Sequence, residues 1–528
     1  MARRAEHPST VWGLVEATAV ARPDQVLLAD DCGRVLTAAT LRDRANAVAA
    51  ALVERGVGSG TVVSWQLPTT LEAIVLLVAL ARLDAVQNPL IAILREREVG
   101  FITAQAGTEL LIVPRRWRGF DHEVLARDLA AARGFDVLTV DLEEPVDAAS
   151  LRLPMRDPAT LPPPRRAAEP DRSLVRWLYY TSGTTADPKG ARHTDASVMA
   201  SAAGMIENAG FTGADVYPIA WPVPHIGGIT VLTTGLVTGV RLVLFDSFDP
   251  ATTPERMAAH HPTLLGTAVP FFNAYMAAQR RHGEAPLFPR LRACVGGGAP
   301  IPAEVHDELQ RTLGVPGVVG SWGLTEFPIA TSATPDDPRD VLVHTVGRLS
   351  SGVELRAQGV DGAVIAAGRE GELVLRGPQQ FLGYLDATLD AAALTDDGWF
   401  RTGDLGHIDL AGNVHITGRL KEIVIRNAEN ISALEVEEAL HRHSSVAEAA
   451  VIGLPDSRTG ERVCAVVVLR PGTDLQLGSL RDHCRGLGLA AQKCPEQLVI
   501  VEQLPRNSMG KVQKPQLRQR ILEAHPSN

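Results

Sequence analysis

Short apolar runs alternate with longer Ala- and Leu-rich runs along the first 110 residues of the chain. The run TVVSWQL (61–67) is rich in β-branched and aromatic side chains, which is typical of a buried strand, and ELLIVP (109–114) is a second such run. Between them, LEAIVLLVALARL (71–83) has the length and composition of a helix. Strands that alternate with helices predict an α/β fold with a mainly parallel sheet.

This pattern continues to about residue 350 and then changes twice. Strand signals such as SLVRWLYY (173–180) and LRACVGGG (291–298) alternate with helix signals such as TDASVMASAAGM (194–205). From 351 to 417, short runs between turns predict an antiparallel β unit: GVELRA, GELVLRG and GNVHITG. Beyond it, a helix in SALEVEEALHRH and strands in VAEAAVIGLP and ERVCAVVVLR predict a compact α+β unit.

We therefore predict two domains. The large N-terminal domain (1–418) consists of α/β subdomains plus the small β unit, and a small α+β domain follows at 419–528. A chain of 528 residues is too long for a single hydrophobic core, which supports this division. The proline-rich segment 152–171 is predicted to be a connector within the large domain.

Composition and charge exclude several classes of protein. With 51 basic and 61 acidic residues, the net charge of -10 argues against a broad nucleic-acid surface. Glu72, Arg82 and Asp84 interrupt the most apolar run, which is too short to span a bilayer, so we expect a buried helix and no stable membrane insertion. Five cysteines without a CxxC pair and the absence of a recognisable signal peptide favour a cytoplasmic location.

The stretch YYTSGTTADPKGARHT (179–194) has the clearest chemical character. We expect a strand up to Tyr180, a loop at 181–190, and then a helix with Thr194 or Asp195 as its N-cap. Glycines in the loop let backbone N–H groups approach an anion closely, and hydroxyls and one lysine add donors and charge. The residues concerned are Thr181, Ser182, Gly183, Thr184, Thr185, Lys189 and Gly190. We interpret this segment as a polyphosphate-binding loop.

The loop does not have the Walker pattern, because Lys189 precedes its glycine and Ala191 follows it. Instead, YTSGTTADPKG resembles the phosphate-binding signature of the adenylate-forming superfamily, which comprises acyl-CoA synthetases, peptide-synthetase adenylation domains and luciferases. Further segments resemble motifs of this superfamily in the same order: NPLIAILREREVGFI, PVPHIGG, CVGGGAP, GSWGLTEFP, GWFRTGDLGHID, GRLKEIVI and LPRNSMGKVQK. The chain most resembles bacterial acyl-CoA synthetases, the enzymes that join fatty acids, aromatic acids or cyclic acids to CoA.

The resemblance implies an ATP site and a fold in which the small C-terminal domain is mobile. The implied ATP-binding residues are Thr181, Ser182, Gly183, Thr184, Thr185, Lys189, Gly298, Ala299, Pro300, Trp322, Gly323, Asp404 and Arg419. Within this set, Asp404 corresponds to the carboxylate that binds the ribose hydroxyls, since a carboxylate accepts two such hydrogen bonds. Trp322 is expected to stack on adenine, where the family usually has a tyrosine.

Catalytic roles are implied for four residues. Thr325 corresponds to a contact of the α-phosphate, Glu326 to the Mg²⁺-binding carboxylate, and Lys511 to the lysine that bridges substrate carboxylate and α-phosphate. His225 maps to the border of the acyl pocket. Lys421 corresponds to the hinge residue about which the small domain rotates.

The acyl pocket implied by the resemblance is lined by small or apolar residues: Ile226, Gly227, Gly228, Gly297, Val319 and Gly320. They favour an uncharged acyl group of medium length or a ring. No Asp stands near 225–228 to hold an ammonium group, so α-amino acids are disfavoured. The chain departs from the family at two places: Asn427 and Ala428 replace a Gly-Gly pair near the expected pantetheine tunnel, and Asp84 replaces a glycine.

The expected reaction follows from these assignments. The carboxylate of the substrate displaces pyrophosphate from Mg²⁺-bound ATP, and the thiol of CoA then displaces AMP from the acyl-adenylate. The expected partners are therefore a carboxylic acid, ATP and CoA, and a homodimer is compatible with the sequence. Three alternatives stay open: acyl transfer to a carrier-protein phosphopantetheine, a luciferase, and a nucleotide-binding protein without catalysis.

Overall fold

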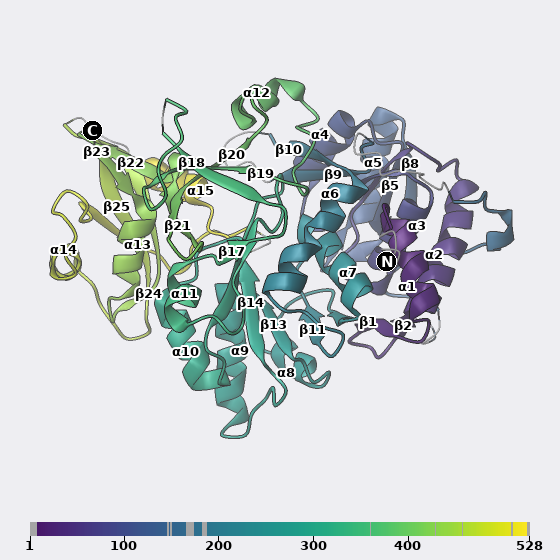
Figure 1. The fold of residues 1–528 in the computed structure, drawn as a ribbon, viewed down its shortest axis with the longest axis horizontal. Helices are drawn as coiled ribbons and strands as arrows, with labels where there is room; N and C mark the ends of the chain where they lie inside the picture. Colours follow the sequence, from purple (N-terminus) through teal and green to yellow (C-terminus); the bar gives the residue numbers. More distant parts are fainter. Residues whose placement is uncertain are drawn as a thin grey trace, which may run out of the picture.

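Two sheets that are largely parallel form the first half of the protein (Figure 1). The computed structural model describes residues 8–144, 147, 150–164, 174–181, 187–359, 361–427, 429–456, 458–507 and 510–524. The larger sheet has the order β10 (Lys189–His193), β9 (Trp177–Thr181), β4 (Val86–Pro89), β3 (Val62–Trp65), β5 (Leu110–Pro114), β8 (Asp136–Val140), with all neighbours parallel except β9 and β10. The second has the order β11 (Val216–Ile219), β12 (Arg241–Leu244), β1 (Val26–Asp30), β2 (Val35–Thr37), with only β2 antiparallel. The predicted α/β fold with a mainly parallel sheet is confirmed.

Helices cover these sheets and pack between them. They are α1 (Val11–Ala21), α2 (Ala38–Val53), α3 (Leu71–Arg82), α4 (Glu96–Ala106), α5 (His122–Arg133), α6 (Asp195–Ala200) and α7 (Ile226–Thr238), with a two-stranded ribbon of β6 (Arg116–Trp117) and β7 (Phe120–Asp121) and short turns η1 (Pro158–Thr160) and η2 (Gly204–Asn208). Helix α3 contacts both β1 and β4, which belong to different sheets, and all twelve of its residues are buried. The prediction of a buried helix at 71–83 is confirmed.

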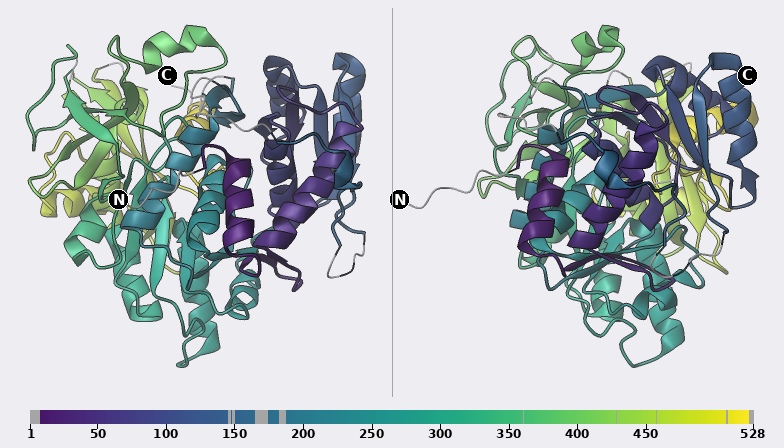
Figure 2. Two further views of the ribbon diagram at one scale, coloured as in Figure 1. Left: turned by 45° about the vertical axis from the view of Figure 1, so that its right-hand side comes forward. Right: turned by 90° about the vertical axis from the view of Figure 1, so that its right-hand side faces the viewer.

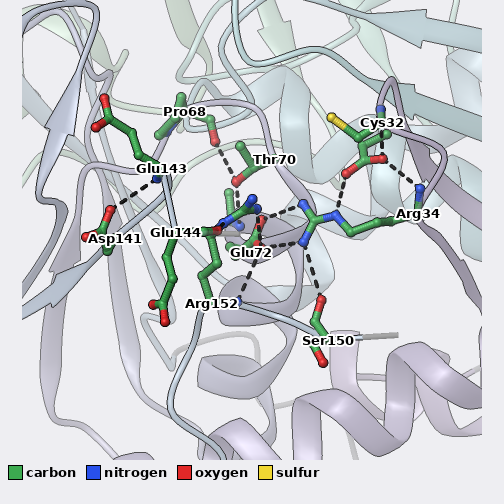
Figure 3. A network of polar contacts seen from close by, with 12 residues as sticks. Cys32, Arg34, Pro68, Thr70, Glu72, Asp141, Glu143, Glu144, Ser150 and Arg152 are labelled. Carbon is green, nitrogen blue, oxygen red and sulfur yellow. Dashed lines mark hydrogen bonds and ion pairs between the residues drawn. The ribbon is translucent and has the colours of Figure 1, made fainter. Parts of the chain in front are cut away.

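The charge of Glu72 in α3 is neutralised inside the protein (Figure 3). Glu72 is fully buried, and both of its oxygens accept hydrogen bonds from Arg34, at 2.7 and 3.3 Å. Arg34 also donates to Asp30, and Arg152 lies 3.4 Å from Glu72. Burial opposes ionisation of Glu72, but Arg34 outweighs it and holds the pKa of Glu72 below its usual range. No helix in the described ranges is both long and apolar enough to cross a membrane.

The third sheet and the β unit lie in the middle of the chain. The third sheet has the order β13 (Leu264–Thr267), β14 (Ala293–Gly297), β15 (Val318–Trp322), β16 (Thr331–Ser332), β17 (Arg348–Leu349), flanked in sequence by α8 (Thr253–Ala258), α9 (Val269–His282), α10 (Ala303–Leu313) and α11 (Arg339–His344). The β unit is a fully antiparallel sheet of β18 (Glu354–Gln358), β19 (Gly371–Arg376), β20 (Phe400–Ile408) and β21 (Val414–Arg419), with η3 (Ala387–Leu389) and α12 (Asp390–Ala393) between β19 and β20. The predicted antiparallel unit is confirmed.

The C-terminal elements have a core of their own. Two buried clusters contain only residues from Val424 onward. The elements are η4 (Leu420–Glu422), β22 (Ile423–Arg426), β23 (Glu429–Ser432), α13 (Ala433–His441), β24 (Val446–Asp456), β25 (Gly460–Leu469), α14 (Leu477–Gly486), β26 (Gln497–Ile500) and α15 (Lys514–Ala524). They lie at one side of the molecule and the purple and blue N-terminal elements at the other (Figures 1 and 2). Helix α13 and strands β24 and β25 are the helix and the two strands predicted for this unit.

The segment after Tyr180 differs from the prediction. Lys189 and Gly190 do not belong to a loop that leads directly into a helix; they begin strand β10, which pairs with β9 so that Lys189 stands opposite Thr181. The expected helix begins at Asp195 with Thr194 as its N-cap, as predicted, but α6 already ends at Ala200. Ser182, Gly183, Thr184 and Thr185 lie outside the described residues.

Candidate active site

Asp404 is fixed at the junction of the third sheet and the β unit. Trp322, the last residue of β15, donates its indole N–H to Asp404 Oδ2 at 2.8 Å. Arg419 stands opposite Asp404 in the β20–β21 pair, and its Nε lies 2.6 Å from Oδ1. The carboxylate is 1% exposed. Three residues that the sequence placed around the nucleotide are therefore in direct contact, and Trp322 has a second use that the sequence did not reveal.

Lys511 reaches this cluster from the C-terminal domain. Burial is the main cause that lowers its pKa to about 8; Arg419 lowers it further, and Glu422 and Asp404 act in the opposite sense. Within the described part of the chain, no hydrogen bond or ion pair involves the Lys511 ammonium. Gly510 lies against the start of α9 in the large domain, since a Cβ on it would stand 3.6 Å from Pro270. The structure thus brings Lys511 to Asp404 and Arg419.

The loop that carries Lys511 is held by its own hydrogen bonds and by an ion network. The backbone N–H of Lys511 donates to Asn507 Oδ1 at 2.9 Å, and Arg506 donates to the carbonyl of Gly510 at 2.5 Å. At the end of the loop, Lys514 Nζ lies 2.5 Å from Glu422 and 2.8 Å from Glu437. Because both ends of the loop are anchored, its lysine has a defined position.

Glu326 and Lys189 face the same aromatic ring. The hydroxyl of Tyr384 donates to Glu326 Oε1 at 2.5 Å, and Lys189 Nζ lies 5.2 Å from the centre of the Tyr384 ring. Glu326 is 7% exposed and Tyr384 4%. Sequence reasoning placed Lys189 at the phosphates and Glu326 at Mg²⁺ but missed Tyr384. This residue lies 58 residues after Glu326, in none of the segments that matched the superfamily.

His193 is a second residue that sequence reasoning missed. Its Nε2 lies 2.8 Å from the carbonyl oxygen of Thr325 and its Nδ1 3.0 Å from Ser197 Oγ. Burial lowers the pKa of His193 to about 4, so the ring is neutral near pH 7 and Nε2–H donates to Thr325. The turn with Thr325 and Glu326 is thereby attached to β10. No signal in the sequence indicated this role, because strand β10, on which His193 lies, was itself not predicted as a strand.

The start of α7 contains the residues expected at the acyl pocket. His225 is the N-cap of α7, because its Nδ1 accepts from the N–H of Gly227 at 3.2 Å, and burial lowers its pKa to about 4. A Cβ on Gly227 would stand 3.3 Å from the Trp221 ring, and one on Gly228 only 1.9 Å from the carbonyl of Val223. Only glycine therefore fits at 228, whereas Trp221 limits the space beside Gly227.

The other pocket candidates lie on the paired strands β14 and β15. Val319 and Gly320 stand opposite Val295 and Gly296, next to Gly297. A Cβ on Gly297 would stand 2.6 Å from the Ser321 carbonyl, so its glycine is explained by a neighbouring backbone. The turn after β14 contains Gly298, at φ +81°, with Ala299 and Pro300. Lys421 lies apart in η4, exposed and without an ion pair to any residue that the structure describes.

Both departures from the family pattern fall at unusual backbone angles. Asn427 has φ +50° and Asp84 has φ +56°. Asn and Asp are the side chains that adopt this left-handed region most readily after glycine. Replacement of the family's glycine at these positions thus preserves the backbone. Ala428 lies outside the described residues.

Comparisons with known proteins agree over nearly the whole chain. The family described as AMP-binding enzyme matches residues 15–385, and AMP-binding enzyme C-terminal domain matches residues 435–511. The chain is 34% identical over 512 residues to the sulfoacetate–CoA ligase of Cupriavidus necator, with 96% of each protein covered. It is 31% identical to the medium-chain fatty-acid–CoA ligase of Escherichia coli, over 96% of this chain and 89% of that protein. ATP-bound MatB from Rhodopseudomonas palustris superposes with a TM-score of 0.84 at 27% identity, over 98% of this chain and 100% of that one.

Proposed function

The chain belongs to the AMP-binding enzyme family, and from this premise we propose that it joins an uncharged hydrophobic acid, of medium length or cyclic, to CoA. As an acid–thiol ligase of the acyl-CoA synthetase type, it activates a carboxylic acid with ATP and transfers the acyl group to CoA. The observation that carries the proposal is that the Lys511 ammonium, which pairs with no residue that the structure describes, lies close to Asp404 and Arg419 of the β20–β21 pair, about a hundred positions earlier in the chain.

The proposed division of labour follows from charge. A carboxylate that attacks the α-phosphorus brings two anions together, so cations must be in place before the reaction. We propose that Lys511 contacts both anions and that Lys189 binds the departing phosphates. Thr325, attached to His193, contacts the α-phosphate, and Asp404 accepts hydrogen bonds from the ribose. The loop residues Thr181, Ser182, Gly183, Thr184 and Thr185 complete the phosphate site.

Glu326 suits the Mg²⁺ that accompanies ATP. Mg²⁺ prefers oxygen ligands and is usually held by one or two carboxylates together with substrate phosphates. Tyr384 bonds to one oxygen of Glu326, and no other described residue bonds to this carboxylate. The second oxygen of Glu326 is therefore available to bind Mg²⁺ as one ligand. When bound, Mg²⁺ would supply positive charge at the phosphates.

The substrate class is inferred from the expected pocket. Its six residues, Ile226, Gly227, Gly228, Gly297, Val319 and Gly320, include no charged side chain. The relative that acts on sulfoacetate has a substrate with a second anionic group, which this set does not balance. The relative named for medium-chain fatty acids has the substrate type that hydrophobic burial favours here.

A panel of acids tests the proposal. Exchange of pyrophosphate into ATP is expected with medium-chain or cyclic acids and to be weak with sulfoacetate and α-amino acids. CoA-dependent release of AMP is expected with the same acids. Exchange without CoA-dependent AMP release would favour a carrier-protein acceptor. If no acid supported exchange, the protein would be a nucleotide-binding protein instead.

A further inference from the structure

Residues 381–385 of the β unit are hydrogen-bonded both to β10, which carries Lys189, and to the turn that carries Glu326. Between β19 and β20, the N–H of Phe381 donates to the carbonyl of Glu326 at 2.9 Å. Leu382 donates to the carbonyl of Arg192 at 2.8 Å, and Leu385 to that of Gly190 at 2.7 Å. The segment thus runs beside β10 like an additional strand and also holds the backbone of Glu326. Its position is set by the two elements that carry Lys189 and Glu326.

Tyr384 projects from this segment in a fixed orientation. Its N–H donates to Asp390 Oδ1 at 2.7 Å, and its ring packs edge-on against Phe381 with ring centres 5.0 Å apart. The side chain is almost fully buried, so it has little freedom to leave Glu326. Burial and the charge of Glu326 raise the pKa of the Tyr384 phenol far above its usual value, and it therefore remains a proton donor.

One side chain therefore holds opposite charges apart. Lys189 lies over the ring face, where a cation is attracted to the π electrons, and Glu326 bonds to the hydroxyl at the ring edge. Among the described residues, no ion pair joins Lys189 to Glu326. Without this separator, the half-buried ammonium of Lys189 and the buried carboxylate of Glu326 would be free to pair with each other. Each would then be less available to the phosphates and to the metal.

We propose that Tyr384 is a positioning residue for Mg²⁺–ATP, which directs Glu326 toward the metal through its hydroxyl and keeps Lys189 free for the phosphates through its ring. This inference rests on the proposed roles of Lys189 and Glu326. The two contacts belong to different parts of the side chain, so two substitutions separate them. Tyr384→Phe removes only the hydroxyl, and Tyr384→Leu removes the ring as well.

The test measures ATP affinity by calorimetry, once with EDTA and once with saturating Mg²⁺, together with the Mg²⁺ dependence of pyrophosphate exchange. For Tyr384→Phe we expect unchanged affinity for ATP in EDTA and an approximately tenfold rise in half-saturating Mg²⁺, as is typical when an outer partner of a metal ligand is lost. For Tyr384→Leu we expect weaker ATP binding in EDTA as well. Tyr275→Phe is the matched control, because the Tyr275 hydroxyl is as deeply buried and donates to the carbonyl of Gly266 instead.

The outcomes separate the two proposals. If the wild-type protein showed no exchange with any acid, the proposed function would fail. If the wild type exchanged normally and Tyr384→Phe kept its Mg²⁺ dependence, the role of Tyr384 would be refuted alone. An equal shift in Tyr275→Phe would also refute it, because the effect would then be a general consequence of losing a buried hydroxyl. Melting temperatures of all three variants check that each is folded.

Discussion

The Lys511 ammonium is buried and has no ion-pair partner among the described residues, and both facts affect its pKa. The buried ammonium is less stable than in water, and none of its described neighbours forms an ion pair with it. ATP would supply the missing negative charge and thereby raise the pKa of Lys511. Nucleotide binding near pH 9 is therefore expected to take up a proton. The motif around Lys511 pointed to its role, but its pKa depends on Arg419 and Asp404, which only the folded chain brings close.

The pH dependence of adenylation follows from this pKa. In the role proposed for Lys511 the protonated ammonium is the active form, so kcat/KM for pyrophosphate exchange should fall above about pH 8, where free Lys511 loses its proton. The decline in kcat should appear at higher pH because bound phosphates stabilise the cation. In Lys511→Arg the alkaline decline of the residual activity should disappear, since arginine stays protonated. A decline at pH 8 that persisted in this variant would assign it to another group.

At the scale of elements, local pattern was a good guide where segments were long or regular. Helix α3, the strands β18, β19 and β21 of the β unit, and α13, β24 and β25 could all be predicted, because each has a clear apolar face or a continuous apolar run. Strand β10 could not. It has five residues, begins with the lysine of a glycine-rich segment, and is stabilised by residues 381–385, almost two hundred positions away. The sequence around β10 gives no indication of a partner segment so far away.

The buried ion network around Glu72 is expected to stabilise the N-terminal core in which α3 packs. In Glu72→Gln the guanidinium of Arg34 loses its buried carboxylate, and we expect the free energy of unfolding to fall by about 3 kcal/mol. Urea unfolding at pH 7 measures this change. Glu54→Gln is the control, since Glu54 and Arg156 form an exposed pair that should contribute less than about 1 kcal/mol.

The effect of Glu72 should depend on pH in a defined direction. Its folded-state pKa is lowered, so its contribution is complete above the usual carboxyl pKa and is lost as the pH falls through the acid range. The difference in stability between wild type and Glu72→Gln should therefore shrink in acid. A difference that stayed constant with pH would show that the ion pair is not its cause.

At the scale of the molecule, the order of motifs indicated that a C-terminal lysine must reach a site built by the large domain. The structure has this closed arrangement, with Gly510 against α9 and Lys511 near Asp404. The sequence could not indicate how the domains fit together, because that depends on surfaces rather than motifs. The boundary at 418/419 and the pivot at Lys421 stay predictions, as does a cytoplasmic location.

Separate assays of the two half-reactions test this closed arrangement. Lys511→Ala should lower acyl-adenylate formation by about 10²–10³-fold, the cost typical of removing one group that stabilises developing charge. It should leave thioester formation from added acyl-adenylate and CoA nearly unchanged, because that step forms no bond to the α-phosphate. Equal losses in both steps would contradict the proposed role of Lys511.

Lys514 gives the small domain an internal brace. Its ammonium joins Glu422, directly after the proposed pivot, to Glu437 on α13 and to the loop that ends in α15. If the small domain rotates about residue 421, Lys511 would therefore move with it as part of a rigid body, and its loop would keep its shape. Rotation of the folded small domain would then withdraw Lys511 once pyrophosphate has formed. No part of that domain would have to unfold and refold in each catalytic cycle.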